Sequence, residues 1–247
     1  MTLVRELLGL LLPVECGGCG ADDVAWCPAC AARVAGPPWR CEDRAPRLDR
    51  LDGSGALPVW TLADCTGDVR RGIVAWKDRG RIDLTGPFAL AATSAARVVA
   101  GRLDLDDRPL LVVPAPSTAA SRRRRGADLV GTLATAVARG LSDAGVPAEA
   151  VPVLARAGGR DQVGLGARAR ARNLAGHVRV RPVHVRRVRG SAVLVVDDIL
   201  TTGATLAASR TALERAGARV VGGITLASTP GPTAPPRLPP GRPVSTG

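Results

Sequence analysis

The sequence contains no tyrosine, one phenylalanine and four tryptophans, so aromatic side chains make up only 2% of its residues. This scarcity argues against extensive stacking on nucleic-acid bases. Lysine is almost as rare, since Lys77 is the only lysine among 34 basic residues. Retention of one lysine in a chain so rich in arginine favours a need for a compact ammonium group at that position, with neutral drift as the alternative.

Long apolar runs are also missing. Residues 7–14 are apolar, but the run is only eight residues long, contains Gly9 and Pro13, and precedes no small-residue cleavage site, so a signal peptide is not expected. Its leucines fall instead at the spacing of a short amphipathic helix (Leu3, Leu7, Leu10, Leu11). No stretch approaches the length needed to span a bilayer. We therefore expect a cytoplasmic protein.

Positive charge is in excess, with a formal net charge of +12 that comes partly from arginine runs at 122–125 and 179–189. Such an excess indicates a polyanionic partner, which is nucleic acid, pyrophosphate or both. A solvated basic face is the alternative. The sign of the charge does not indicate which of these anions the protein binds.

Four of the six cysteines form the pattern Cys16-x2-Cys19-x7-Cys27-x2-Cys30. Each Cys-x2-Cys pair can fold into a knuckle that directs two thiolates at one metal, and two knuckles complete a tetrahedral structural Zn²⁺ site. In a segment with almost no core of its own, the metal would supply the main folding energy. Redox disulfides are the alternative. Cys41 and Cys65 lack nearby partners.

Residues 193–205 combine an apolar run, two acids and a small hydroxyl-rich turn. The run 193–196 predicts a strand buried on both faces, and a helix is expected over 206–216. The free N–H groups and dipole at a helix start favour a phosphate, and acids just upstream are placed to accept hydrogen bonds from sugar hydroxyls. The segment therefore fits a sugar phosphate. Its polar and turn residues are Asp197, Asp198, Thr201, Thr202, Gly203, Ala204 and Thr205.

This segment resembles the phosphoribosyl-pyrophosphate (PRPP) binding motif of type I phosphoribosyltransferases, a hydrophobic strand followed by two acids and Thr-Thr-Gly-Ala-Thr. An ordinary strand-turn-helix with an acidic turn is the alternative. The resemblance implies that Asp197 and Asp198 hold the ribose hydroxyls and help to stabilise positive charge on the ring. Residues 201–205 would then anchor the 5′-phosphate.

Strand and helix patterns alternate from residue 59 onward. Strands are expected at 59–63, 110–113, 151–154, 193–196 and 220–227, with 178–188 as a strand or hairpin, and helices at 67–78, 84–101, 127–144 and 206–216. This alternation predicts an α/β fold, a mostly parallel sheet flanked by helices, with the site at the carboxyl edge. We expect a helix and zinc module at 1–35, a linker at 36–58, a phosphoribosyltransferase-like domain at 59–228, and a disordered proline-rich tail at 229–247.

A zinc-ribbon-like module ahead of such a domain resembles the ComF family, which is known for a role in natural competence and DNA uptake. Residues 64–81 resemble the family's block ending in Lys-x-Arg-Gly, with matches at Lys77, Arg79 and Gly80. Val113-Pro114-Ala115-Pro116 resembles its Val-Pro-Val-Pro strand end. The family's middle signature is reproduced at Gln162, Leu165, Arg170, Asn173 and Gly176.

The resemblance implies a site for the leaving pyrophosphate, which needs cations: Mg²⁺, with Lys77, Arg79 or arginines from 122–125 as candidates. Lys77 is implied as a catalytic residue beside the two acids. The pyrophosphate loop would be Pro114, Ala115, Pro116 and Ser117, for which a proline-stiffened turn is the alternative. Gln162, Arg170 and Asn173 would lie on a flap over the acceptor, or make structural bonds within that loop.

Two departures affect the acceptor side and the metal count. Where the family continues Arg-Gly-Phe-Asn-Gln, this chain has Arg125-Gly126-Ala127-Asp128-Leu129, which loses an amide pair. Many relatives in that family carry a second set of Cys-x2-Cys pairs. This chain retains only Cys41 of that set, so one zinc is expected and not two. Two functions stay open. One is transfer of phosphoribosyl from PRPP to an unknown acceptor. The other is a non-catalytic module that binds a nucleotide monophosphate or single-stranded DNA, with the zinc module docking a competence or recombination protein.

Overall fold

The computed structural model describes residues 14–48, 55–106, 108–117, 128–156 and 178–231. Several predictions fall outside these ranges and are not addressed by the structure. They are the helix within 3–11, the arginine run 122–125, the flap residues Gln162, Arg170 and Asn173, and the tail from 232 onward. Within the described ranges, no helix is both long and apolar enough to cross a membrane.

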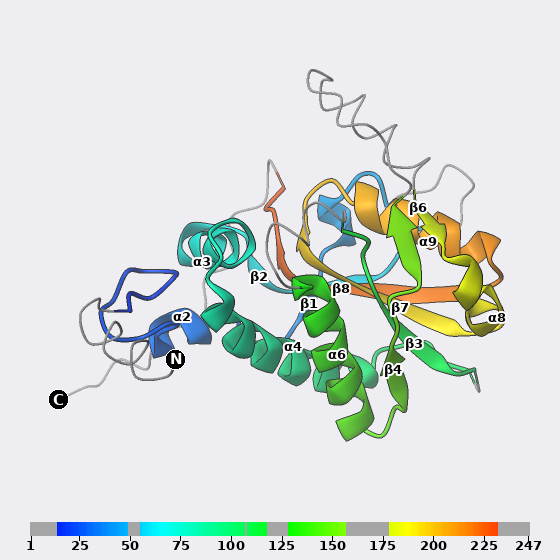
Figure 1. Cartoon of the computed structure of the whole chain (residues 1–247), viewed down its shortest axis with the longest axis horizontal. Coiled ribbons are helices and arrows are strands. Elements are labelled where there is room, and N and C mark those ends of the chain that lie inside the picture. The colour runs from blue at the N-terminus through cyan, green and yellow to red at the C-terminus, as the bar shows by residue number, and fades with distance from the viewer. Residues whose placement is uncertain (1–13, 49–54, 107, 118–127, 157–177, 232–247) are drawn as a thin grey trace, which may run out of the picture.

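The main sheet has six strands in the order β1-β2-β8-β7-β3-β4 (Figure 1). The strands are β1 (Trp39–Arg40), β2 (Val59–Asp64), β8 (Arg219–Ser228), β7 (Ala192–Leu200), β3 (Leu110–Pro114) and β4 (Ala148–Ala150). β1 runs antiparallel to β2, and every other neighbouring pair is parallel. The carboxyl ends of β2, β8, β7 and β3 therefore meet at one edge, which confirms the predicted α/β fold.

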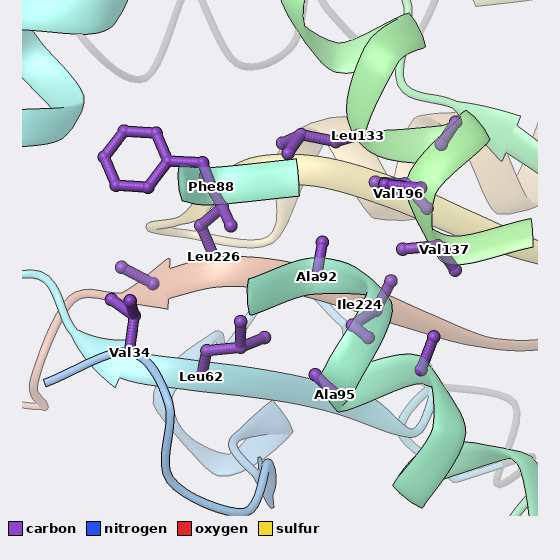
Figure 2. Packing of buried hydrophobic residues seen from close by; sticks show 14 of the residues in the cluster. Val34, Leu62, Phe88, Ala92, Ala95, Leu133, Val137, Val196, Ile224 and Leu226 are labelled. Carbon is purple, nitrogen blue, oxygen red and sulfur yellow. The ribbon is translucent and has the colours of Figure 1, made fainter. Parts of the chain in front are cut away.

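Helices cover both faces of this sheet. α3 (Gly67–Asp78), α4 (Thr85–Ala100) and α6 (Leu129–Asp143) pack on one face, and α9 (Ala204–Arg215) packs on the other. Side chains of β7 alternate between them, since Leu194 and Val196 join the first cluster while Val193 and Val195 join the second. Figure 2 shows the first cluster, where α4 and α6 lie over β2, β7 and β8. Burial on both faces explains the unbroken apolar run of β7.

The cysteine module, which contains the short helix α2 (Pro28–Ala32), packs directly against α3 and α4. The Trp26 ring fills a notch at Gly72 of α3, where a Cβ would lie 2.4 Å from a ring carbon. The same ring meets Phe88 of α4 edge-on, with centroids 5.1 Å apart. Arg71 of α3 also donates a 2.6 Å hydrogen bond to the carbonyl of Gly18. The module therefore shares the core of the main domain.

Two strand predictions were wrong in detail. The strand expected at 151–154 is instead β4 at Ala148–Ala150, followed by β5 at Leu154–Arg156 in a separate antiparallel pair with β6 (Val178–Val180). Pro152 lies between β4 and β5 and separates them, because proline has no backbone N–H to donate to the hydrogen-bond ladder of a sheet. Likewise only Val178–Val180 of the stretch 178–188 is a strand. Pro182 starts a 3₁₀ turn (Pro182–His184), which runs into the helix α8 (Val185–Val188).

The segment 36–58, expected to be a linker, contributes to the sheet. Its residues Trp39–Arg40 form β1, and Glu42–Arg44 form a 3₁₀ turn. Cys41, Ala45, Leu48 and Leu57 are all nearly inaccessible to solvent. A two-residue strand is too short for sequence periodicity to reveal it.

Candidate functional site

The two acids of the motif lie within β7 itself, near its carboxyl end. The Asp198 carboxylate is buried, and its Oδ2 atom lies 2.5 Å from the ammonium nitrogen of Lys77, in the last turn of α3. Asp198 Oδ1 also accepts a 2.8 Å hydrogen bond from the N–H of Ile199. The structure thus brings together Lys77 and Asp198, two predicted residues far apart in the sequence.

Asp197 lies in a less favourable electrostatic environment. It is half-buried, and its Oδ1 atom accepts a 2.9 Å hydrogen bond from the N–H of Asp198. Burial of its carboxyl group, followed by the negative charge of Asp198, raises the pKa of Asp197 to about 7, although the Lys77 ammonium opposes the shift. Desolvation and a like charge both favour the neutral acid. A ligand that donates hydrogen bonds or brings a cation would stabilise the ionised form.

The predicted phosphate loop joins β7 to α9. Thr201 and Thr202 are exposed, and Gly203, with φ of 78°, takes the left-handed conformation immediately before the helix starts at Ala204. Glycine adopts this conformation without the strain that a side chain would add. The N–H groups of the first turn of an α-helix have no acceptor within the helix and point outward from its start. The loop therefore offers backbone donors and exposed hydroxyls at one place.

The predicted pyrophosphate loop lies on the neighbouring strand. β3 ends at Pro114, which is paired in register with Val196, and the N–H of Ala115 donates a 2.7 Å hydrogen bond to the Val196 carbonyl. Ala115 and Pro116 are buried, and Ser117 is half-buried. This loop thus begins directly beside the two acids. Arg79 is exposed at the end of α3, two residues from Lys77.

The sequence interpretation missed a buried ion pair at the same edge of the sheet. Arg44, in the 3₁₀ turn after β1, pairs with Asp64 at the end of β2, and both side chains are at least nine-tenths buried. Arg44 also donates a 3.1 Å hydrogen bond to the hydroxyl of Ser228, the last residue of β8. Asp64 ends a buried strand much as the two motif acids do, which is the one signal in the sequence that would have drawn attention to it.

The four cysteines of the N-terminal module converge as predicted. The Sγ atoms of Cys16, Cys19, Cys27 and Cys30 all lie within 4.8 Å of one another, and all six cysteines of the chain are free thiols. Zn–S bonds of about 2.3 Å require S–S separations of about 3.8 Å at a tetrahedral site. The cluster fits one metal ion such as zinc, and the disulfide alternative is wrong for this structure.

A pocket of about 800 Å³ lies between α4, α6 and the start of the loop after β4, and it is mostly apolar. Pro114 is the only predicted site residue in its lining, which otherwise includes Thr93, Arg97 and Arg139. It does not include the two acids or the phosphate loop. The chemistry of the site therefore lies beside this pocket and not inside it.

The raised pKa of Asp197 predicts a pH-dependent cost in stability. A carboxyl whose pKa rises on folding, here from 3.8 to about 7, holds its proton more tightly in the folded chain, so stability falls as pH rises through that window. Asp197→Asn removes the charge and keeps an acceptor oxygen. We expect this variant to melt several degrees above wild type at pH 8 (about 2–4 °C for each kcal/mol gained), with the gain shrinking toward pH 4.

The control is Asp104→Asn, which removes one acid at the opposite edge of the sheet, where Asp104 pairs with Arg219 at the start of β8. Calorimetric melting of wild type, Asp197→Asn and Asp104→Asn at pH 5 and pH 8 tests this prediction. A wild-type protein that is as stable as Asp197→Asn at pH 8 would contradict the electrostatic cost.

Comparison with known proteins gives one family match. Residues 133–241 match the family model described as a phosphoribosyl transferase domain, whereas a search of curated proteins found no match. The matched range contains β7 with both acids, the loop 201–205, α9 and β8. It excludes the four cysteines and Lys77. Residues 133–241 thus resemble a phosphoribosyl transferase domain, and the preceding strands β1, β2 and β3 belong to the same sheet as the strands of that range.

Proposed function

We propose that this protein binds PRPP at the carboxyl edge of the sheet and transfers its phosphoribosyl group to an acceptor, with release of pyrophosphate. The observation that carries the proposal is the sequence of groups along β7 and α9. Asp197 and Asp198 lie near the carboxyl end of β7, left-handed Gly203 follows the strand, and a helix begins at Ala204. All of them lie within the range that matches the phosphoribosyltransferase domain.

In this proposal the two carboxylates accept hydrogen bonds from the ribose hydroxyls, and the loop donates to the 5′-phosphate. Thr201, Thr202 and Thr205 supply hydroxyl donors, and the backbone at Gly203 and Ala204 supplies N–H groups, of which the Ala204 N–H would exchange its 3.4 Å hydrogen bond to Thr202 Oγ1 for the phosphate. Each ribose–carboxylate hydrogen bond also shifts Asp197 toward its ionised form, because it stabilises the charged acid. Binding of the sugar therefore offsets part of the cost of placing two acids side by side.

Transfer breaks the bond between ribose C1 and a pyrophosphate oxygen and leaves positive charge on the ring. Ionised Asp197 and Asp198, held rigidly in a strand, stabilise that charge electrostatically. Mg²⁺, a hard cation suited to carboxylate and phosphate oxygens, would neutralise the leaving pyrophosphate. The Lys77 ammonium, which pairs with Asp198, would donate to the same group. The loop Pro114, Ala115, Pro116 and Ser117 and the exposed Arg79 would complete the pyrophosphate side.

The direct test is PRPP binding in the presence of Mg²⁺, followed by calorimetry. We expect the Asp197→Ala, Asp198→Ala double variant to lose binding, whereas an Asp104→Ala, Asp106→Ala control with the same change in net charge keeps it. The control acids pair with Arg219 and Arg108 far from the site. Turnover is then measured as pyrophosphate release across a panel of acceptor bases, with Lys77→Ala expected to lower the rate by roughly 10²-fold or more. Absence of PRPP binding by wild type would sink the proposal.

We also propose that the cysteine cluster holds one structural Zn²⁺. Cys16, Cys27 and Cys30 are buried beside Trp26, so the metal would fasten the ring that fills the notch of α3. We expect one zinc per chain by elemental analysis, and a lower melting temperature with red-shifted tryptophan emission after chelation. Cys30→Ser should lose the metal, and the matched change Cys65→Ser, outside the cluster, should retain it. Equal melting with and without chelator would contradict a structural role.

A second candidate function is binding of single-stranded DNA through a basic ridge, defined as residues 178–189. The ridge contains five arginines and no acid, and only Arg187 forms an ion pair with a described residue, Glu149. Arg179, Arg186 and Arg189 are exposed. Arginine forks suit phosphate oxygens, and contacts of this kind give affinity without base stacking.

This alternative predicts an affinity for single-stranded DNA that falls steeply with salt and does not change in the Asp197→Ala, Asp198→Ala variant. Arg179→Glu with Arg186→Glu should weaken binding and flatten the salt dependence. The control, Arg97→Glu with Arg108→Glu, makes the same charge change elsewhere. Fluorescence anisotropy at several salt concentrations compares them, and equal losses in both pairs would rule out the ridge as the binding surface.

The resemblance to the ComF family extends the proposal to a role in natural competence and DNA uptake, with competence or recombination proteins as partners and a cytoplasmic location. Lys77, Arg79 and Gly80, the residues that match the family's Lys-x-Arg-Gly block, support this extension. They also link it to the site, because Lys77 pairs with Asp198.

A further inference from the structure

Residues 41–48, here called the brace, connect β1 to the carboxyl edge of the sheet. At one end, the N–H of Cys41 donates a 2.9 Å hydrogen bond to the Val59 carbonyl. In the middle, Arg44 is fixed by Asp64 and Ser228, the last residues of β2 and β8. The brace is thus held by two strand ends of the sheet that carries the motif acids.

The far end of the brace lies against the phosphate loop. The N–H of Arg47 donates a 3.2 Å hydrogen bond to the carbonyl of Thr202. A Cβ at Gly203 would lie 2.7 Å from Leu48 Cγ and 3.1 Å from the Cβ of Ala45. Ala45 and Leu48 are both buried, at 0% and 2% exposure. The glycine required by the left-handed turn is therefore also the point at which the loop meets the brace.

This contact bears on ligand binding because the loop is short and its backbone donors act only from a defined position. A turn with two exposed threonines and a glycine has few side chains to hold it by itself. Precise placement of donors is worth more than their number, since small displacements of a binding group cost much of its contribution. Leu48 packs against Gly203, and the Arg47 N–H restrains the Thr202 carbonyl.

We propose that Leu48 and the backbone of Arg47 are positioning residues for the phosphate loop, so that a segment outside the family-matched range sets its affinity for a phosphorylated sugar. The identity of the ligand rests on the proposed function. The geometric part does not, because Arg47 and Leu48 contact the loop through atoms of the chain alone. The brace restrains the loop whether or not PRPP is the substrate.

The test compares Leu48→Ala with Leu57→Ala. Both leucines are buried in the same cluster, but Leu57 precedes the amino end of β2, about 20 Å along the strand from the site edge. Both truncations should lower the melting temperature. Only Leu48→Ala should speed amide hydrogen exchange at Arg47 and Ala207, whose N–H groups donate to the Thr202 and Gly203 carbonyls, in the ligand-free protein. It should also weaken Mg²⁺-PRPP binding by about tenfold. Leu48→Met, which keeps the volume, should restore both.

Leu48→Val provides a milder truncation if the alanine variant does not fold. Loop exchange that rises equally in the Leu48 and Leu57 variants, or that rises in neither, would overturn the inference, because the brace would then contribute only general stability. If wild type does not bind PRPP, the proposed function fails, and the exchange comparison alone still decides whether the brace positions the loop.

Discussion

Parallel pairing of β7 with β3 on one side and β8 on the other is the constraint on which the rest of the structure depends. It puts the strand that carries the two acids near the middle of the sheet, where both faces must be apolar up to Val196. The carboxylates can follow only at the edge where strands end and helices begin. The same pairing brings Ala115 onto the Val196 carbonyl and Ser228 beside Leu200, so neighbouring strand ends supply the surroundings of the acids.

Two adjacent carboxylates at that edge are electrostatically costly, and the structure offsets the cost unequally. Asp198 pairs with the ammonium of Lys77 and accepts a hydrogen bond from the N–H of Ile199, whereas Asp197 accepts a hydrogen bond from the N–H of Asp198. Burial of the carboxyl group, followed by the negative charge of Asp198, raises the pKa of Asp197, and Lys77 opposes only part of this shift. Hydrogen bonds or a cation supplied to Asp197 by the proposed ligand would offset this cost, in the way that binding sites commonly trade stability for function.

Local patterns in the sequence were sufficient for the elements that repeat a period. The apolar run before Asp197, the small turn before α9 and the cysteine spacing each predicted what the structure contains, because strand burial, helix starts and metal knuckles depend on residues close together in the chain. The contacts that complete the site were not predictable in this way. Lys77 meets Asp198 only through the packing of α3 on the sheet, and Arg44 reaches Ser228 across 184 positions.

The same distinction explains why the segment 36–58 was misjudged. Prolines and glycines there indicate turns, of which the structure shows one at Pro46. The segment is anchored instead by single long-range contacts that leave no periodic signal. Ala45 and Leu48 form one side of an apolar contact, and Gly203 of the phosphate loop forms the other side. A sequence read element by element assigns the loop to the phosphoribosyltransferase-like domain and the brace to a linker, although the two contact each other directly.

The cysteine module and the brace reach the site from two directions along one stretch of chain. Trp26 of the module sits in the notch of α3, the helix that carries Lys77 to Asp198, and the brace follows the module through β1 to the phosphate loop. A metal held by the four thiolates would thus stabilise the packing of Trp26 on α3, the helix that positions the Lys77 ammonium. It would also fix the start of the chain segment that leads through the brace to the phosphate loop. The small module, which has too few apolar residues to fold around a core of its own, is best understood as part of the framework of the site.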